Sequence, residues 1–259
     1  MSVRGRASSN NPLTGAGYLL RGFRLLTRSG VKRYVVAPLL VNIIVFGTLF
    51  YLLWSQFGSL RTYVEGWLPD WLDFLSWLLL PLVVLLSALV LFFGFSALGN
   101  LFAAPFNGFL AEAVERSLTG TAPETSGGFA SVMREAARDV RSQFRKLGYF
   151  VSRAVPLLLF FLVPGLNLAA PFLWFAFSAW MLAVEYADYA MANHGLSFSQ
   201  QRDILAHRRW LALGFGGATS VALLVPGLNL AVIPAAVAGA TALWVEQLAP
   251  GLRPGGAGR

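Results

Sequence analysis

The sequence predicts an all-α integral membrane protein, and three observations support this fold class. The chain of 259 residues is 56% hydrophobic. Only 12% of its residues are charged, which is about half the share found in soluble domains. Apolar runs long enough to cross a bilayer follow one another from the first third of the chain onward. A soluble helical bundle of this composition would have too little polar surface.

The N-terminal part is predicted to be polar first and then amphipathic. Residues 1–12 are small, polar and basic, and we expect a disordered tail. Residues 13–248 are expected to form a single helical membrane domain. It opens with an amphipathic helix over 13–28, which lies on the membrane surface with Phe23 on its apolar side and Arg24 on its polar side.

Two long transmembrane helices are expected next. The first covers residues 34–57, with Pro38 in its first turn, and the second covers 72–103. A short acidic loop at 58–73 separates them. The segment "APFNG" at 104–108 is expected to end or kink the second span, and a short helix follows it.

The remaining elements are one polar helix and two hairpins. A basic helix over 131–147 is expected outside the membrane. Two apolar segments, at 149–184 and 211–247, are each expected to fold into a helical hairpin, and a mobile Gly/Pro-rich tail covers 249–259.

The seven residues "VPGLNLA" interrupt both apolar segments, at 163–169 and at 225–231. Proline followed by glycine stops a helix and permits a tight turn, and asparagine tolerates unusual backbone angles. Each half of a hairpin is then about fifteen to seventeen residues, whereas a full span needs about twenty.

Two interpretations of the hairpins stay open, and they differ in depth. Each hairpin either spans the bilayer twice with help from its flanks or dips into it and returns. The basic residues place the 58–73 loop outside and the other connections inside, which fits both. The short halves favour re-entry, and the two turns are then expected to be covered by each other or by another subunit. If the hairpins span the bilayer instead, each turn lies at the far membrane surface.

The order of elements is similar to that of the CysZ family of bacterial inner-membrane sulfate transporters, which is related to the EI24 family. The resemblance rests on "RGFRLLTRSGVKRYVVAPLLVNI", "SALGNLFAAPFNGFLAEAVERSLTG" and "PFLWFAFSAWMLAVEYADY", and extends from about Gly15 to Val245. It implies sulfate uptake for assimilation toward cysteine. It also implies two long transmembrane helices and two pairs of half-penetrating helices in a multi-pass inner-membrane protein.

A sulfate site is expected where the first span begins. Sulfate is a compact dianion, and backbone N–H groups at a helix N-terminus together with cationic side chains can replace its water. The residues that offer this are Gly30, Val31, Lys32 and Arg33. The corresponding family segment resembles Pro-Gly-Leu-Arg; here Ser29 replaces the proline and Lys32 the arginine. The alternative is that the two cations only bind lipid phosphate.

Polar residues within apolar segments are the other candidates for the ion path. The amides either bond helices together or line a water-filled path; they are Asn42, Asn100 and Asn107. Three charged residues follow, Glu112, Glu115 and Arg116. Helical spacing lets Glu112 and Arg116 pair, and they form either a surface ion pair or a charged gate.

Composition excludes several other classes. The chain has no cysteine and only two histidines, so neither thiol chemistry nor a His-rich metal site is expected. No nucleophile accompanies a base and no "GxxxxGK" loop is present, so neither an enzyme nor a cofactor is expected. The net charge of +8 in so apolar a chain points to lipid head groups or an anionic solute rather than to nucleic acid.

The sequence therefore predicts a sulfate transporter or channel whose partners are sulfate and membrane lipids. A homo-oligomer is expected because one protomer with half-length helices could hardly enclose a pore. The rivals are a hairpin protein that shapes membranes or scaffolds partners, and an accessory subunit of another transporter.

Overall fold

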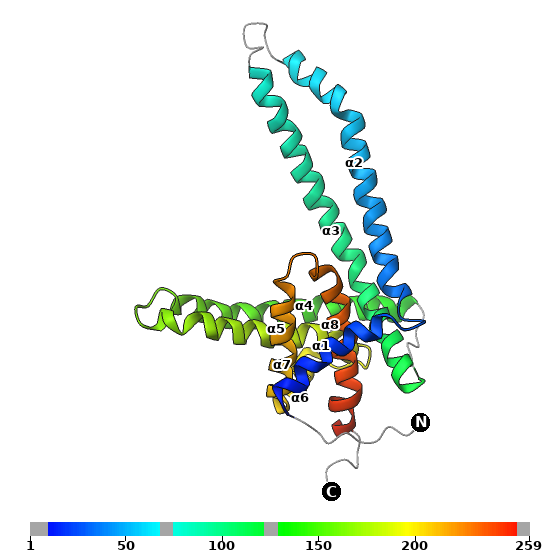
Figure 1. Cartoon of the computed structure of the whole chain (residues 1–259), viewed down its shortest axis with the longest axis vertical. Coiled ribbons are helices and arrows are strands. Elements are labelled where there is room, and N and C mark those ends of the chain that lie inside the picture. Colours follow the sequence, from blue (N-terminus) through cyan, green and yellow to red (C-terminus); the bar gives the residue numbers. More distant parts are fainter. Residues whose placement is uncertain (1–9, 68–74, 122–128, 253–259) are drawn as a thin grey trace. The chain divides into compact units, whose positions relative to one another are not determined.

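The computed structural model describes residues 10–67, 75–121 and 129–252 (Figure 1). All regular elements in these ranges are helices. In chain order they are α1 (Pro12–Leu26), α2 (Arg33–Trp67), α3 (Ser76–Thr119), α4 (Phe129–Phe160), the 3-10 helix η2 (Leu166–Leu168), α5 (Ala170–Ala192), α6 (Phe198–His207), α7 (Arg209–Leu223), α8 (Asn229–Leu243), the π-helix η3 (Trp244–Leu248) and the 3-10 helix η4 (Ala249–Leu252). The predicted fold class is thus confirmed at the level of an all-helical chain.

Three helical segments within the described residues are long and apolar enough to cross a membrane. They are Arg33–Gln56, Ala170–Ala192 and Asn229–Leu248. A shorter apolar segment, Leu78–Phe93, lies in the predicted second span.

Several predicted boundaries were wrong because helices continue through residues that looked like breaks. The first long helix runs on to Trp67, so most of the predicted 58–73 loop is helical. Pro38 then lies inside the helix, not in its first turn. The helix assignment of α3 continues through 104–108, and α4 joins the predicted 131–147 helix to the first hairpin without interruption.

Both predicted tails contribute to the structure where it describes them. Asn11 caps α1, because its side chain accepts from the Leu13 N–H at 2.8 Å. Asn10 caps α7 by accepting from the N–H groups of Trp210 and Leu211 at 3.1 and 3.2 Å. At the other end, Ala249–Leu252 is helical. Residues 1–9 and 253–259, where the rest of these two predictions falls, lie outside the described residues.

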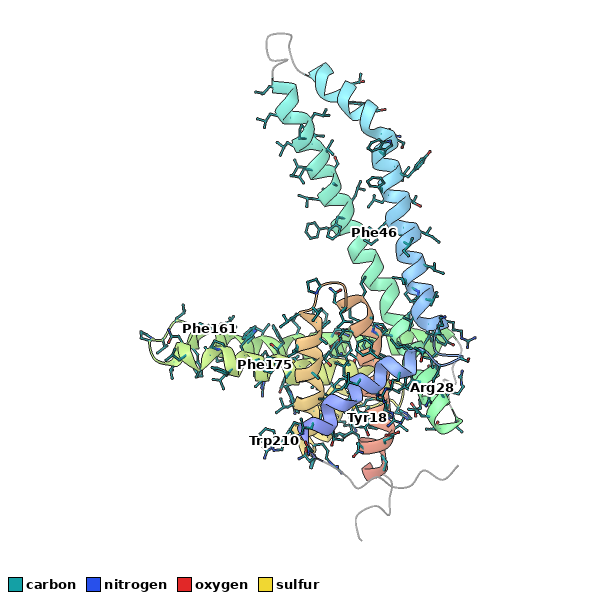
Figure 2. All side chains as sticks on the ribbon, in the orientation of Figure 1. Tyr18, Arg28, Phe46, Phe161, Phe175 and Trp210 are labelled. Atoms are coloured by element: carbon teal, nitrogen blue, oxygen red, sulfur yellow. The ribbon has the colours of Figure 1, made fainter. Side chains whose placement is uncertain are left out.

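The chain divides into two units, Arg33–Phe106 and the remainder, and each has its own kind of packing. The unit Arg33–Phe106 holds α2 and most of α3. Its described side chains are largely exposed and apolar, and rings from the two helices meet where Phe46 and Phe92 lie 6.3 Å apart. Figure 2 labels Phe46 on α2.

The other unit, which we call the helical core, is built around α1. This helix crosses α7 and α8 (Figure 1) and buries Tyr18, Leu19 and Leu25 against them. The predicted amphipathic helix is therefore confirmed as a helix. Part of its apolar side is covered by protein, whereas Leu20 is 64% exposed, and its place on the membrane surface stays a prediction.

Glycines allow these helices to approach backbone to backbone. A Cβ added to Gly15 would lie 2.0 Å from the Leu211 carbonyl oxygen, and one added to Gly22 would lie 1.9 Å from that of Ala235. A Cβ on Gly216 of α7 would lie 1.7 Å from the carbonyl oxygen of Ala179 in α5. Side chains cannot fit at these crossings, so the core depends on small residues much as membrane helix pairs do.

The two "VPGLNLA" segments form turns, as predicted. Gly165 and Gly227 have φ angles of +86° and +81°, values that favour glycine. The first turn leads through η2 into α5, and the second leads directly into α8. The second half of the first hairpin was predicted too short, because α5 continues to Ala192.

The turns are not covered by each other. Leu168 and Leu230 occupy the same position of the repeat, and 78% and 70% of their surfaces are exposed. Figure 2 shows Phe161 at the tip of the first hairpin. Apolar tips of this kind have to be covered by something outside the described chain.

Candidate functional site

The predicted sulfate segment lies between α1 and α2. Gly30 has a φ of +90°, and a Cβ placed on it would meet nothing within 4 Å, so the turn is open on that side. Lys32 and Arg33 are exposed, whereas Val31 is fully buried. Figure 2 labels Arg28 just after α1, where it begins this turn.

The backbone of this segment differs from the expectation. The N–H groups of Val31 and Lys32 both donate to the Arg28 carbonyl oxygen at 3.2 Å. They are therefore used in the turn, and the expectation that they are free for an anion was wrong. With these two N–H groups used, anion binding here would rely mainly on side chains.

The side chains keep their positive charge available. Among the described residues no carboxylate forms an ion pair with Lys32 or Arg33. The Arg33 guanidinium lies 4.8 Å from the ring centre of Tyr34 and donates to its hydroxyl at 3.0 Å. The Tyr34 hydroxyl accepts that bond and keeps its own proton to donate.

The charged residues near the end of α3 differ in burial, and Glu115 is the buried one. Glu115 is 8% exposed, and its two carboxylate oxygens lie 2.9 and 3.1 Å from Nε2 of His194. Its role is therefore to hold the end of α3 against the α5–α6 connection. Sequence reasoning missed this contact because the partners are 79 residues apart.

Glu112 and Arg116 do not close an ion pair within the described residues. Glu112 is half-buried and Arg116 is exposed. Burial raises the pKa of Glu112, the charge of Arg116 opposes this shift, and the charge of Glu115 adds to it. This carboxyl therefore gains protons more readily than an exposed one.

The three asparagines lie on the long helices. The side chains of Asn42 and Asn100 are outside the described residues. Asn107 is half-buried and hydrogen-bonds with Tyr189, and the nearby Gly108 carbonyl accepts from Asn193 at 3.3 Å. Asn107 thus joins α3 to α5, which matches the packing alternative for this residue.

Two charged clusters that the sequence did not reveal lie at matching places in the hairpins. In the first, which we call the Lys146 clamp, Nζ of Lys146 lies 2.5 Å from Asp188 and 3.3 Å from Glu185. Burial lowers the pKa of Lys146, but the two carboxylates outweigh it, and the net pKa is raised. Lys146 thus remains charged although its side chain is only 7% exposed.

In the second cluster, the Arg21 clamp, Arg21 of α1 makes a two-pronged ion pair with Glu246. The Tyr18 hydroxyl donates to the same carboxylate at 3.1 Å. Both clamps join the second helix of a hairpin to a cation from another helix. Glu185 lies twenty residues after Gly165, and Glu246 nineteen after Gly227.

No group of three or more metal-binding side chains occurs within the described part of the chain. At the start of α2 the described side chains are instead two cations and a hydroxyl, from Lys32, Arg33 and Tyr34, and groups of these kinds can hold an anion through charge and hydrogen bonds.

A comparison with protein families identifies the family of the chain. Residues 18–234 match the family described as sulfate transporter CysZ/etoposide-induced protein 2.4. This range covers most of the 259 residues, so the chain belongs to that family. The resemblance found in the sequence is confirmed, and the chain is a membrane protein related to sulfate transporters.

Proposed function

We propose that the protein is a sulfate transporter or channel of the bacterial inner membrane that supplies sulfate for cysteine biosynthesis. The observation that carries the proposal is the family match over residues 18–234. Such a protein passes the ion intact and makes or breaks no bond, so it is not an enzyme. It acts on sulfate within the lipid bilayer and needs no cofactor.

Sulfate is first bound by side chains at the start of α2. Lys32 supplies a point charge, Arg33 a planar fork, and the Tyr34 hydroxyl a further donor. Because the Val31 and Lys32 N–H groups are occupied, these side chains carry the site. Gly30 leaves the approach open, since nothing lies within 4 Å of the position its Cβ would take.

The two hairpins re-enter the membrane from one side. With 15 residues, α7 is about 22 Å long, whereas the hydrocarbon layer is about 30 Å thick. The second helices, in Ala170–Ala192 and Asn229–Leu248, are long enough to cross that layer, so for them re-entry is inferred from where their uncharged parts end. Residues 170–184 and 229–245 are free of charge and end at the Lys146 and Arg21 clamps, respectively. Charged clusters are costly in hydrocarbon, so the clamps mark the level where each hairpin leaves it.

Several copies enclose the path. The exposed apolar turns and the exposed apolar faces of α2 and α3 are larger than a water-soluble surface tolerates, and lipid and neighbouring protomers cover them. Asn42 and Asn100 remain our candidates for the path, and Glu112 and Arg116 our candidates for a charged gate. Glu115 positions this gate through His194.

The test is uptake of radiolabelled sulfate into liposomes that hold only the purified protein. We expect uptake by the parent and a large loss in Arg33→Ala, while Arg209→Ala, which removes an exposed arginine at the start of α7, retains it. Equal uptake by both variants would remove the start of α2 from the site.

The rival functions give different results in the same liposomes. Vesicle remodelling by a folded parent without sulfate flux would favour a membrane-shaping protein. Flux that begins only when a second protein is added would favour an accessory subunit.

A further inference from the structure

A cavity of about 700 Å³ lies in the helical core. It is lined in part by the two residues that follow Glu246 of the Arg21 clamp. One wall comes from α6 and its flanks, and the other from the π-helix Trp244–Leu248. Its polar lining residues are Gln200, Asp203, His207, Arg208 and Gln247. The volume is in the range of small-molecule sites, and no residue of the predicted sulfate segment contributes to it.

Arg208 is the cation of this cavity. It is the residue at which α6 ends and α7 begins, so both helices fix its backbone. Its Nη1 is buried and has no hydrogen-bond partner among the described residues. An unpaired buried donor is unfavourable, and an anion in the cavity would give the guanidinium, after a small rotation, both acceptors and a counter-charge.

Further polar groups come from two neighbours on α6. Nδ1 of His207 donates to the Asp203 carbonyl oxygen at 2.7 Å, which leaves Nε2 to accept from a hydroxyl of the ligand or, in the imidazolium form, to donate to one of its oxygens. The Gln200 side-chain oxygen accepts from Ser197 N and Oγ at 2.9 and 2.8 Å, so its NH₂ group is left to donate. The Asp203 carboxylate is 63% exposed and pairs with Arg202 at 3.3 Å, which moderates its repulsion of an anion.

The rest of the lining is apolar, from Leu196, Ile204 and Leu248. The π-helix places Leu248 and Gln247 at the cavity, and π-helical turns occur frequently at functional sites. A ligand that fits this lining has an anionic group with several oxygens and a carbon skeleton attached to it.

We propose that this cavity binds a phosphate ester, with the phosphate at Arg208, His207 and Gln200 and the carbon part against Ile204 and Leu248. Three polar side chains match the three free oxygens of a phosphate monoester, one of which can carry a proton for Nε2 of His207, whereas a carboxylate offers two oxygens. The ester is either a lipid head group or a small soluble molecule. The site is separate from the proposed sulfate path and does not depend on it.

The test measures binding to the full chain purified in a detergent that has no phosphate or sulfate group. The probes are dioctanoyl phosphatidic acid and glycerol 3-phosphate, and dioctanoylglycerol is the control without phosphate. We expect phosphate-dependent binding to the parent, weakened at least about tenfold in Arg208→Gln because a charge-assisted hydrogen bond is lost. Binding of the lipid alone would identify the ligand as a lipid head group. Equal binding of both probes would identify it as a soluble ester.

Matched variants separate this site from general charge effects. Arg209→Gln removes the next cation, which is exposed and outside the cavity lining, and Arg33→Ala removes the proposed sulfate contact. Arg209→Gln should bind the probes like the parent, and any binding lost in Arg33→Ala but kept in Arg208→Gln belongs to the start of α2. If Arg208→Gln does not fold, Ile204→Glu places a carboxylate in the cavity wall and should abolish binding with Arg208 intact. No binding to the parent, or equal weakening in Arg208→Gln and Arg209→Gln, would overturn the proposal.

Discussion

The two helical hairpins contain the same seven-residue turn but are held in place differently. The α7–α8 hairpin packs backbone to backbone against α1 through Gly15, Gly22 and Gly239. The α4–α5 hairpin takes part in one such crossing, where Gly216 of α7 meets Ala179 of α5, but a Cβ on its own Gly148 would meet nothing within 4 Å. Its two helices are joined to each other by polar side chains, through the Lys146 clamp and a 3.1 Å hydrogen bond from Trp180 Nε1 to the Tyr149 hydroxyl.

This difference shows which part of a hairpin is determined locally. The turn follows from Pro-Gly-Leu-Asn itself, since both glycines adopt nearly the same φ. The packing follows from residues far away in the sequence. The second helices of the two hairpins differ in burial. In the most apolar part of Asn229–Leu248, 61% of the residues are buried, but in that of Ala170–Ala192 only 39% are.

The largest expected effect is at a glycine crossing. Gly22→Val would put a side chain where even a Cβ lies 1.9 Å from the Ala235 carbonyl oxygen, so α1 would separate from α8. We expect most of the protein to be lost from the monodisperse peak on size-exclusion chromatography in detergent. Gly17→Val, on the same helix but with nothing within 4 Å, is the control and should retain that peak. Similar profiles for both variants would mean that close packing does not hold this hairpin.

The next largest effect is expected at the Lys146 clamp. Lys146→Met leaves Asp188 and Glu185 without their cation, and we expect a loss on the order of 3 kcal/mol in unfolding free energy, seen as a lower Tm. Adding Asp188→Leu should recover part of the loss, because one unpaired carboxylate is removed. A Tm unchanged by Lys146→Met would show that the polar contacts do not hold the first hairpin.

A smaller effect, of the same size at both positions, is expected at the two turn glycines. Gly165→Ala and Gly227→Ala each force a side chain into a positive-φ conformation, at a cost of about 1–2 kcal/mol. Thermal unfolding should show similar decreases for both. Gly148→Ala, inside α4 with open space around it, should be neutral or stabilising. A large decrease in only one turn variant would show that the turns differ in more than their surroundings.

The smallest effect is a difference in alkaline stability. Because the folded pKa of Lys146 is raised, its contribution to stability is complete below the unfolded pKa of about 10.4 and is lost as pH rises above it. We expect the Tm difference between the parent and Lys146→Met to be constant from pH 7 to 9 and to shrink above pH 10. A difference that stays constant to pH 11.5 would contradict the raised pKa.

Local patterns in the sequence were sufficient to predict the two turns and the all-helical fold class. They were insufficient for the contacts between helices. Gly15 and Gly22 lie one heptad apart on α1, and this small-residue spacing could have indicated a close crossing, although not its partners. The burial of Lys146 had no such signal, because Arg145 beside it and the rest of the segment look like a solvated basic helix.

The candidate site was predictable to a similar extent. The exposed cations Lys32 and Arg33 and the turn at Gly30 were found from the sequence. The use of two N–H groups by the Arg28 carbonyl was not, because it depends on how the turn closes. The Glu115–His194 contact joins residues too far apart for any local pattern.

Labelling of single cysteines tests directly whether both hairpins re-enter the membrane from the inner side, as we propose. The natural chain has no cysteine, so Leu168→Cys, Leu230→Cys, Ser59→Cys and Ser199→Cys can each be introduced alone. Intact cells are treated with a membrane-impermeant thiol reagent. If the hairpins re-enter, we expect Ser59→Cys to react, Ser199→Cys to react only after permeabilisation, and neither leucine position to react from outside. Reaction of both leucine positions from outside, as fast as Ser59→Cys, would contradict re-entry and show that the hairpins span the membrane.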